Sequence, residues 1–463
     1  MSYSISLRAV SACIAALALC ISPALGDPKP LSKEEQTRID RAIDRAVSGL
    51  KHVQTKNGDW PRQYATTHLI GQCALPAYAL LESGVPTDDP VIQNAAGYLR
   101  ARVLTNEKTY ELSLALLFFD RLGDPKDKPL IRSLGLRLIA GQLLTGGWNY
   151  RCPSVPKEME DALFKTLQAL DKKQEEGKKL PIKGLRVPAT MRTLTVFRDP
   201  RLLPWQDASE SDENKQFARI VGTTDNSNTQ FAVLGLWAAQ RHDIPIGPTF
   251  RLMVERFERT QSADGWWPYL FDRSPIASRH PRPSMICVGL LGLAAGSGVK
   301  SPMADRTHVD NRQQLVLKGL FALSEDIDVA ASGRDGVGTL AWRGPYYLWS
   351  VERVAMLYNL PTIEDKDWYR WGAGILVASQ RPGGEWRLLT LSPKSPPMPY
   401  YGPILNTSFA LLFLKRSHPM KDLTPKLPST GKELNASIVR LRSRGVPDFR
   451  RTTTSSDSQK SDR

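Results

Sequence analysis

One short phrase occurs four times in this chain: a Gln, a Gly four positions later, and a Trp six positions after the Gln. The copies are Gln54, Gly58 and Trp60; Gln142, Gly146 and Trp148; Gln261, Gly265 and Trp267; and Gln380, Gly384 and Trp386. Because Trp accounts for only 11 of 463 residues, four copies with identical spacing indicate a structural repeat. Such repeats stack into a ring or a solenoid, which restricts the fold more than any other feature of the chain.

Each copy ends an amphipathic helix and is followed by a second helix of a different kind. Before the first copy, apolar residues lie three and four positions apart on one helical face. They are Ile39, Ala42, Ile43, Ala46, Val47, Leu50 and Val53. The second helix is apolar on nearly every side, as at 231–237 and 409–414, and such a helix is buried. The unit is therefore an exposed outer helix, a turn with Trp, and a buried inner helix.

The three residues of the phrase suit a turn that joins neighbouring units. Gly can adopt the positive φ that ends a helix. The Gln side chain can bond a backbone group left unpaired at the helix end. We expect each Trp to be buried against a neighbouring unit, so the four Gln and four Trp residues are predicted to be structural and to contact no ligand.

The spacing of the copies predicts six units, two of which have lost the phrase. In the first of these, an outer helix is expected near 90–104 and an inner helix at 110–122. In the second, the outer helix is expected at 312–323 and the inner helix at 346–357. Both pairs have the apolar pattern of the complete units, so the repeat continues without its signature.

The segment 151–224 is a long insertion, rich in Lys, Pro and Glu, within which 158–174 can form one helix. Loops of this length are uncommon unless they are functional or disordered. The insertion is therefore a candidate lid or partner surface, with a surface elaboration as the alternative.

Residues 1–26 have the pattern of an export signal, with Arg8 before an apolar run at 9–21 and small residues near Gly26. The run is too short to span a bilayer. We expect cleavage near Gly26 and an exported protein, periplasmic or extracellular; lipid anchoring at Cys20 is the alternative. The three remaining thiols are too few and too scattered for a disulfide framework.

The net charge of +15 favours anionic partners such as an acidic polymer or a membrane surface. Much of the excess lies at 172–201 and in the tail at 421–463, which has few apolar residues to bury. We expect this tail to be disordered. It is either a solvated segment or a contact with an anionic surface, and no sequence-specific nucleic-acid partner is expected.

A helix ending in Gln-x-x-x-Gly-x-Trp is the QW motif, and the chain resembles the terpenoid cyclase and protein prenyltransferase superfamily. The resemblance covers roughly 37–416. It implies an all-α fold, an α/α toroid of outer and inner helices, which we place at 27–420. It implies little about activity, because the motif belongs to the frame of the ring.

Squalene-hopene cyclases, which this chain resembles, protonate their substrate with the middle Asp of a DxDDT motif at the start of an inner helix. The matching segment here begins with Asp225 and Asn226 and continues with Ser227, Asn228 and Thr229. A hydroxyl and an amide replace the second and third carboxylates, and neither is a strong Brønsted acid. Triterpene cyclisation by that mechanism is not expected, and Asp225 and Asn228 are the candidate catalytic residues.

Protein prenyltransferases hold zinc with an Asp, a Cys and a His near the starts of inner helices. Here Cys287 and His68 lie near two such starts, while Asn406 occupies a third where the resemblance would want an acid or a thiol. One Cys and one His on separate helices are a weak zinc signal. We expect a buried structural thiol and a helix-end His, with no metal and no cofactor.

Polar and aromatic residues recur where the inner helices begin, which is one mouth of the expected ring. They are His68, Tyr110, Glu111, Asp225, Asn226, Ser227, Asn228, Ser284, Tyr346, Tyr347, Glu352 and Asn406. Helix N-termini offer free N–H groups and partial positive charge to a ligand. The alternative role for each residue is N-capping, which Asp, Ser and Asn commonly perform. Together they make the mouth the candidate site.

Three functions fit these observations. The first is a cavity for an apolar or isoprenoid-like ligand, with aromatic residues such as Tyr346, Tyr347 and Trp349 beside it. The second is a binder or lyase of anionic polysaccharide, because other α/α toroids cleave uronic-acid polymers. Its candidate groups are Asn226, Asn228, His68 and Tyr110. The third is a non-catalytic interaction scaffold that has kept its frame and lost its catalytic groups.

Overall fold

A computed structural model describes residues 28–61, 68–176, 191, 194–197, 224–271, 282–298, 306–327, 344–387 and 402–443. Within these ranges the chain is helical, with isolated bridges and no β-strand, which confirms the all-α prediction. Each helix in them is too short or too polar to cross a lipid bilayer. The predicted signal peptide at 1–26 and most of the insertion lie outside the described residues.

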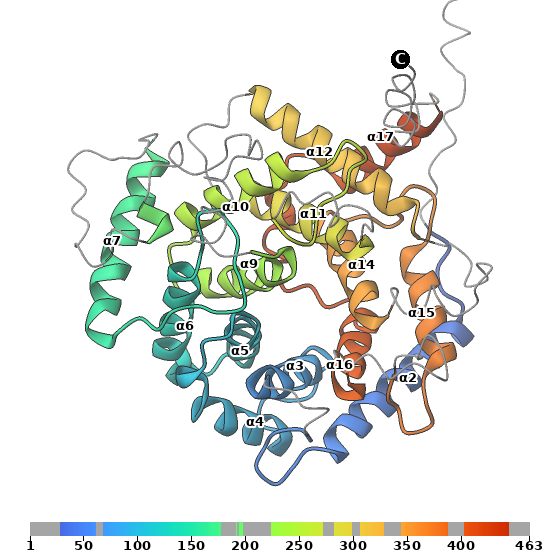
Figure 1. The fold of residues 1–463 in the computed structure, drawn as a ribbon. Helices are drawn as coiled ribbons and strands as arrows, with labels where there is room; N and C mark the ends of the chain where they lie inside the picture. Colours follow the sequence, from blue (N-terminus) through green and yellow to red (C-terminus); the bar gives the residue numbers. More distant parts are fainter. Residues whose placement is uncertain are drawn as a thin grey trace, which may run out of the picture.

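Six helices of the described chain form an inner group. They are α3 (Leu69–Glu82), α5 (Thr109–Leu122), α9 (Asn226–Gln240), α11 (Pro283–Ser297), α14 (Pro345–Leu357) and α16 (Pro403–Leu414). Nearly every residue of these helices is buried, as their apolar composition requires. Each contacts the next in chain order, and α16 contacts α3, so the inner helices close into a cycle (Figure 1).

An outer helix precedes each inner one within the described residues. The outer helices are α2 (Lys33–His52), α4 (Pro90–Arg100), α6 (Lys128–Ala140), α10 (Gly247–Thr260), α12 (Arg306–Ser324) and α15 (Trp368–Ser379). Both units predicted without the phrase are present, with outer helices α4 and α12. Outer and inner helices therefore alternate along the described chain. The helix predicted inside the insertion is α7 (Lys157–Glu175), which packs against α6 and α10 (Figure 1).

The Gln of each phrase joins its own turn to the next outer helix. Its Nε2 donates to the Gly carbonyl four residues later and to a second carbonyl on the neighbouring helix. The second acceptors are Val91 for Gln54 (2.8 Å), Thr249 for Gln142 (2.9 Å), Leu315 for Gln261 (2.9 Å) and Ala42 for Gln380 (2.8 Å). Because Ala42 belongs to α2, the last phrase connects α15 to the first outer helix.

The four indoles are buried as predicted, none more than 2% exposed. Each Nε1 donates to the carbonyl ten residues earlier, near the end of its own outer helix. The Trp267 ring lies against Gly289 of α11 and Gly319 of α12, where an added Cβ would meet the indole at 2.1 Å and 3.1 Å. This indole therefore contacts both its own inner helix and the next outer helix.

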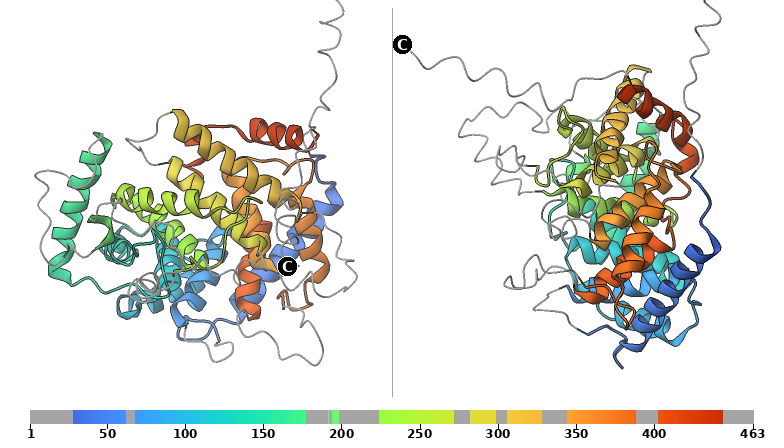
Figure 2. Two further views of the ribbon diagram at one scale, coloured as in Figure 1. Left: turned by 45° about the horizontal axis from the view of Figure 1, so that its top comes forward. Right: turned by 90° about the vertical axis from the view of Figure 1, so that its right-hand side faces the viewer.

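The end of the ring where inner helices finish is crossed by the segment after α16. Trp237 of α9 donates to Asp422 (3.0 Å), and Thr424 donates to the Leu357 carbonyl at the end of α14 (2.8 Å). The chain then forms α17 (Gly431–Ser443), which packs on α12 (Figure 2). The site is therefore to be sought at the opposite end, where the inner helices begin.

The prediction of a disordered tail at 421–463 was wrong for its first half. Leu434 and Ile438, four positions apart, are 2% and 0% exposed and give α17 an apolar stripe that packs on α12. Its basic residues are partly used within the fold, since Arg442 forms ion pairs with Glu325 and Glu364. The disorder prediction failed because it was based on the high charge of this segment and overlooked the apolar stripe. Residues 444–463 lie outside the described chain.

Acidification is expected to loosen this crossing segment through His418. Burial lowers the pKa of His418 from 6.5 to about 4. The unfolded chain then binds this proton at a higher pH than the folded protein does. The contribution of His418 to stability is therefore complete above pH 6.5 and is lost as the pH falls to 4.

The measurement is the melting temperature of the protein between pH 7 and pH 4. His418→Gln should flatten the decline over this window, whereas His52→Gln, on the exposed side of α2, should leave it unchanged. A His418→Gln curve parallel to the wild-type curve would show that His418 is not held neutral by the fold.

Candidate functional site

A row of aromatic rings crosses the interior of the inner ring. Tyr110 of α5 lies 5.0 Å from Phe231 of α9, and Phe231 lies 5.9 Å from Trp349 of α14, measured between ring centroids. Trp349 and Tyr346 lie 4.9 Å and 5.4 Å from Phe409 of α16. Four inner helices therefore contribute to one continuous aromatic surface.

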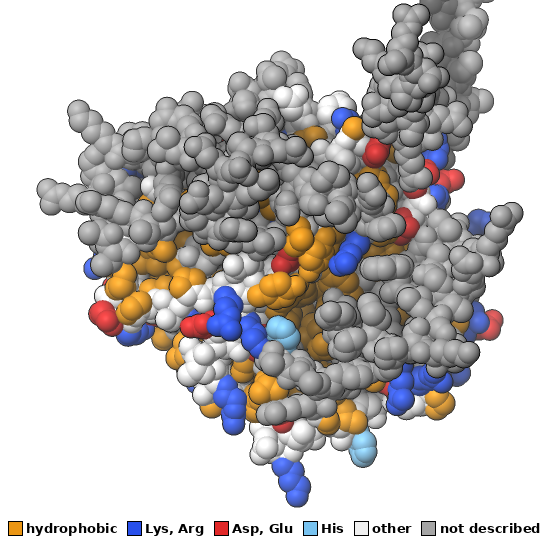
Figure 3. All heavy atoms as spheres, in the orientation of Figure 1, with side chains coloured by type: hydrophobic (Ala, Val, Ile, Leu, Met, Phe, Trp, Pro, Cys, Tyr) orange, Lys and Arg blue, Asp and Glu red, His pale blue; other side chains and the backbone are white. Residues whose placement is uncertain are grey.

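Exposure changes along this row. Phe231, Trp349 and Phe409 are almost fully buried, whereas Tyr110 and Tyr346 are partly exposed. Figure 3 shows hydrophobic side chains gathered in a hollow at the centre of the ring, bordered by Lys or Arg side chains and by a His. The hollow thus exposes hydrophobic side chains, the usual lining of a site for an apolar molecule, and Tyr110 and Tyr346 are the partly exposed rings of the row.

Hydrogen bonds and a cation–π contact support the aromatic row. The Tyr346 hydroxyl accepts a short hydrogen bond from Gln230 of α9 and lies 3.4 Å from the Ser227 hydroxyl. Arg353 donates to Gln230 Oε1 (2.8 Å), and its guanidinium carbon lies 3.6 Å from the centroid of the Trp349 ring. These contacts connect α14 to α9 across the interior, and burial lowers the pKa of Arg353 and raises that of Tyr346.

Glu111 accepts hydrogen bonds at the mouth of the ring, where α3 and α5 begin. Its carboxylate is fully buried and accepts from the Ile70 backbone N–H (2.9 Å) and from Asn106 Nδ2 (2.8 Å). His68 Nδ1 lies 3.1 Å from the same carboxylate, and the half-exposed His68 ring meets Tyr110 edge-on at 6.4 Å. The structure therefore brings together the predicted site residues His68, Tyr110 and Glu111, with Glu111 serving the start of α3.

Asp225 is the N-cap of α9, the alternative role given above for the residues at the mouth. Its carboxylate accepts from the Asn228 backbone N–H (2.6 Å) and from Asn228 Nδ2 (2.7 Å), and burial raises its pKa. Asn226 accepts from Arg256 Nε (2.9 Å) and donates to the Pro268 carbonyl (2.7 Å). Asp225, Asn226 and Asn228 are each no more than 2% exposed. These residues fix the start of α9 and turn their polar atoms toward one another.

The other predicted site residues are dispersed. Ser284 is half-buried in the first turn of α11, and among the described residues no hydrogen bond joins it to another candidate. Tyr347 and Asn406 are buried in α14 and α16, while Glu352 is buried two turns inside α14. Among the described residues, the candidates therefore form no single ring of polar groups at the mouth.

Sequence reasoning missed Gln230, Phe231, Arg353 and Phe409. Phe231 and Phe409 were indistinguishable from ordinary core residues of an apolar helix. Arg353 gave a usable signal, because a guanidinium in an otherwise apolar inner helix must be paired or must serve a site.

The zinc candidates do not meet in the described chain. Cys287 is a buried free thiol inside α11, and burial raises its pKa, whereas His68 lies before α3. Cys73 and Cys152 are also buried free thiols. Within the described ranges, no group of three or more His, Cys, Asp or Glu side chains is arranged to hold a metal ion.

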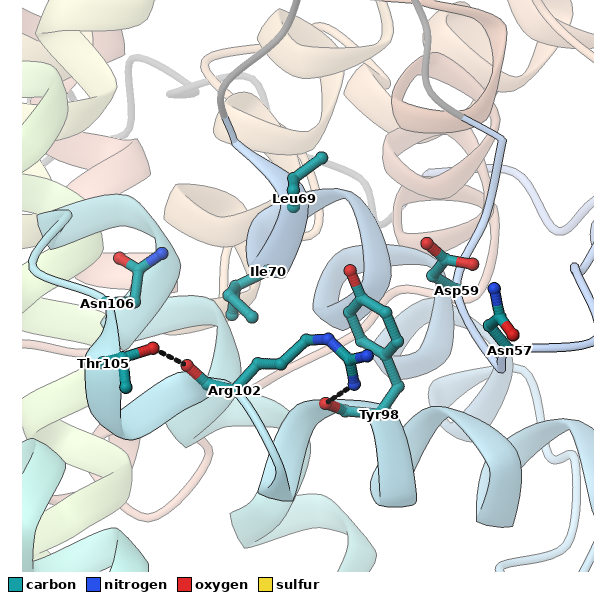
Figure 4. Close-up of a pocket in the computed structure, with 8 residues that line it drawn as sticks. All are labelled: Asn57, Asp59, Leu69, Ile70, Tyr98, Arg102, Thr105 and Asn106. Carbon is teal, nitrogen blue, oxygen red and sulfur yellow. Dashed lines mark hydrogen bonds between the residues drawn. The ribbon is translucent and has the colours of Figure 1, made fainter.

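A cavity of about 370 Å³ lies between the turn at 54–60, the start of α3 and the end of α4 (Figure 4). It is lined by Asn57, Asp59, Leu69, Ile70, Tyr98, Arg102, Thr105 and Asn106. Arg102 lies 4.2 Å from the Tyr98 ring centroid and donates to the Tyr98 carbonyl (3.4 Å). Its lining combines polar side chains with the apolar side chains of Leu69 and Ile70 and the ring of Tyr98.

No protein-family model matches the chain, and no curated protein matches it either. The resemblance to terpenoid cyclases therefore remains a resemblance carried by the four phrases.

Proposed function

We propose that this protein is an exported, terpenoid-cyclase-like toroid that binds an apolar, isoprenoid-like or lipid ligand in its central hollow. The aromatic row from Tyr110 to Tyr346 carries the proposal, since four inner helices supply its rings. Aromatic faces offer large apolar contact with little loss of side-chain freedom, and they suit flat or polyene chains.

Binding is favoured over acid-initiated cyclisation by the geometry at the start of α9. Both oxygens of Asp225 are occupied by Asn228, and the residue is 2% exposed. A general acid must reach the atom that it protonates. Asp225 is held in a cap instead, and its neighbours Ser227 and Asn228 have no proton of suitable acidity.

The polysaccharide alternative receives less support. It requires Asn226 and Asn228 to contact the same polysaccharide chain as His68 and Tyr110. His68 and Tyr110 do meet at the mouth, but Asn226 and Asn228 are 1% and 0% exposed and bonded within the fold. A non-catalytic scaffold remains compatible with the fold, and an empty hollow would favour it.

The proposal predicts that organic extraction of the purified protein recovers a lipid, identified by mass spectrometry. The lipid-free protein should then bind farnesol, an isoprenoid alcohol. Its tryptophan fluorescence should decrease on binding. Tyr110→Ala should weaken this binding about fivefold, because one aromatic contact is worth about 1 kcal/mol.

Tyr150→Ala is the matched control. Tyr150 is 52% exposed and its ring lies 6.1 Å from Tyr110, outside the row that lines the hollow. Farnesol affinity should not change in this variant. Extraction without any recovered lipid, together with no binding of farnesol, would refute the proposal.

A further inference from the structure

Three buried side chains follow Tyr346 on the inward side of α14. Trp349, Glu352 and Arg353 are 0%, 0% and 4% exposed. Their positions are three and four apart, so they share one helical face. Because a helix rises 1.5 Å per residue, Glu352 lies roughly 9 Å deeper in the ring than Tyr346, along the axis of α14. They therefore form the floor beneath the aromatic row.

The floor has an unusual concentration of unused hydrogen-bonding atoms. Among the described residues, no partner is found for Trp349 Nε1, Arg353 Nη1 or either carboxyl oxygen of Glu352. Buried polar atoms in folded proteins are nearly always paired. Four unpaired atoms on three neighbouring side chains point to a group that is bound there in the working protein.

The charges around the floor indicate the kind of group. The charged groups that act on Glu352 are Arg353 of its own helix, Glu82 of α3 and Arg416 after α16. Burial raises the pKa of Glu352 well above its usual range, which favours the neutral carboxyl, a form that can donate a hydrogen bond. The hydrogen-bond partners of Arg353 are neutral: Gln230, Ser350 and the Trp349 carbonyl. The floor thus offers donors and one positive charge.

We propose that the floor binds a carboxylate, and that the ligand of this protein is an amphiphile with a single carboxylate and an apolar chain. This inference rests on the proposed function. The carboxylate would accept from Arg353 Nη1, Trp349 Nε1 and the Glu352 carboxyl, while the chain follows the aromatic row toward Tyr346. A pyrophosphate fits less well, since one guanidinium cannot balance its charge in a buried site.

A matched pair of probes tests the inference. Farnesoic acid and farnesol have the same chain and differ only in the head group. The lipid-free protein should bind the acid at least about tenfold more tightly than the alcohol, because the acid gains charge-assisted hydrogen bonds. Titration calorimetry at one pH and ionic strength gives both dissociation constants.

Arg353→Gln should remove the preference for the acid, because Gln can keep a bond to Gln230 but has no charge. Farnesol affinity is expected to fall as well, because Arg353 packs on the Trp349 ring and bonds Gln230. The readout is therefore the ratio of the two affinities, and the acid and the alcohol should bind this variant equally well. Arg137→Gln is the control: Arg137 is a buried arginine of the outer helix α6, bonded to the Leu104 carbonyl (2.9 Å), and its loss should leave the acid-to-alcohol ratio unchanged.

Glu352→Gln gives a second readout that does not depend on losing the arginine. Gln, like a protonated acid, is a neutral donor, so the preference for farnesoic acid should persist in this variant. A tenfold gain in acid affinity would show that Glu352 is ionised and would overturn the inference. Equal binding of acid and alcohol by the wild-type protein would overturn it too, while leaving the proposed function intact. If neither probe binds, the proposed function itself fails.

Discussion

Replacing Trp267 by Ala is expected to lower the free energy of unfolding by about 3–5 kcal/mol, the usual cost of truncating a buried Trp. The Trp267 ring is 1% exposed and lies between α11 and α12, and its Nε1 donates to the Phe257 carbonyl (2.8 Å). The truncation would therefore leave a cavity between units and an unpaired carbonyl at the end of α10.

The adjacent residue supplies the control, because Trp266 has the same side chain and is only half-buried. Trp266→Ala should cost about 1 kcal/mol or less. Equilibrium unfolding in urea, followed by circular dichroism, measures both changes. Equal effects of the two substitutions would mean that burial between units is not what makes the repeated Trp important.

The outer and inner helices could be predicted because burial leaves a strong trace in sequence. An outer helix buries one face, so its apolar residues recur three and four apart, as in α2. An inner helix buries all faces, so its sequence is apolar throughout, as in α11 and α16. This contrast was strong enough to predict α4 and α12 where the phrase is missing.

The site could be predicted only in outline. The sequence indicated the starts of the inner helices as the candidate region, but capping and recognition use the same residue types, and Asp225 is a cap. The ring contact from Phe231 to Trp349 and the hydrogen bond from Gln230 to Tyr346 join residues more than 100 positions apart. No local pattern records such pairs, because they depend on how the ring closes.

Ring closure itself depends on the last phrase, and this predicts a large effect at Gly384. Gly384 has a φ of +88°, and an added Cβ would lie 2.3 Å from the Arg45 carbonyl oxygen of α2. Gln380 bonds the same helix through the Ala42 carbonyl (2.8 Å) and accepts from Arg45 Nη2 (2.6 Å). The contact is between two backbones, so neither side can yield by rotating a side chain.

Gly384→Ala is therefore expected to destabilise the protein by roughly 3–5 kcal/mol, combining the cost of a left-handed residue with that of forcing two backbones apart. Gly84→Ala separates these costs, because Gly84 has a φ of +94° and no atom within 4 Å of an added Cβ. It should lose only about 1–2 kcal/mol, from conformation alone. Urea unfolding of the two variants gives the difference, and hydrogen exchange should show faster opening of α2 and α15 in Gly384→Ala only. If the variants were equally stable, close approach of α15 to α2 would contribute nothing to the ring.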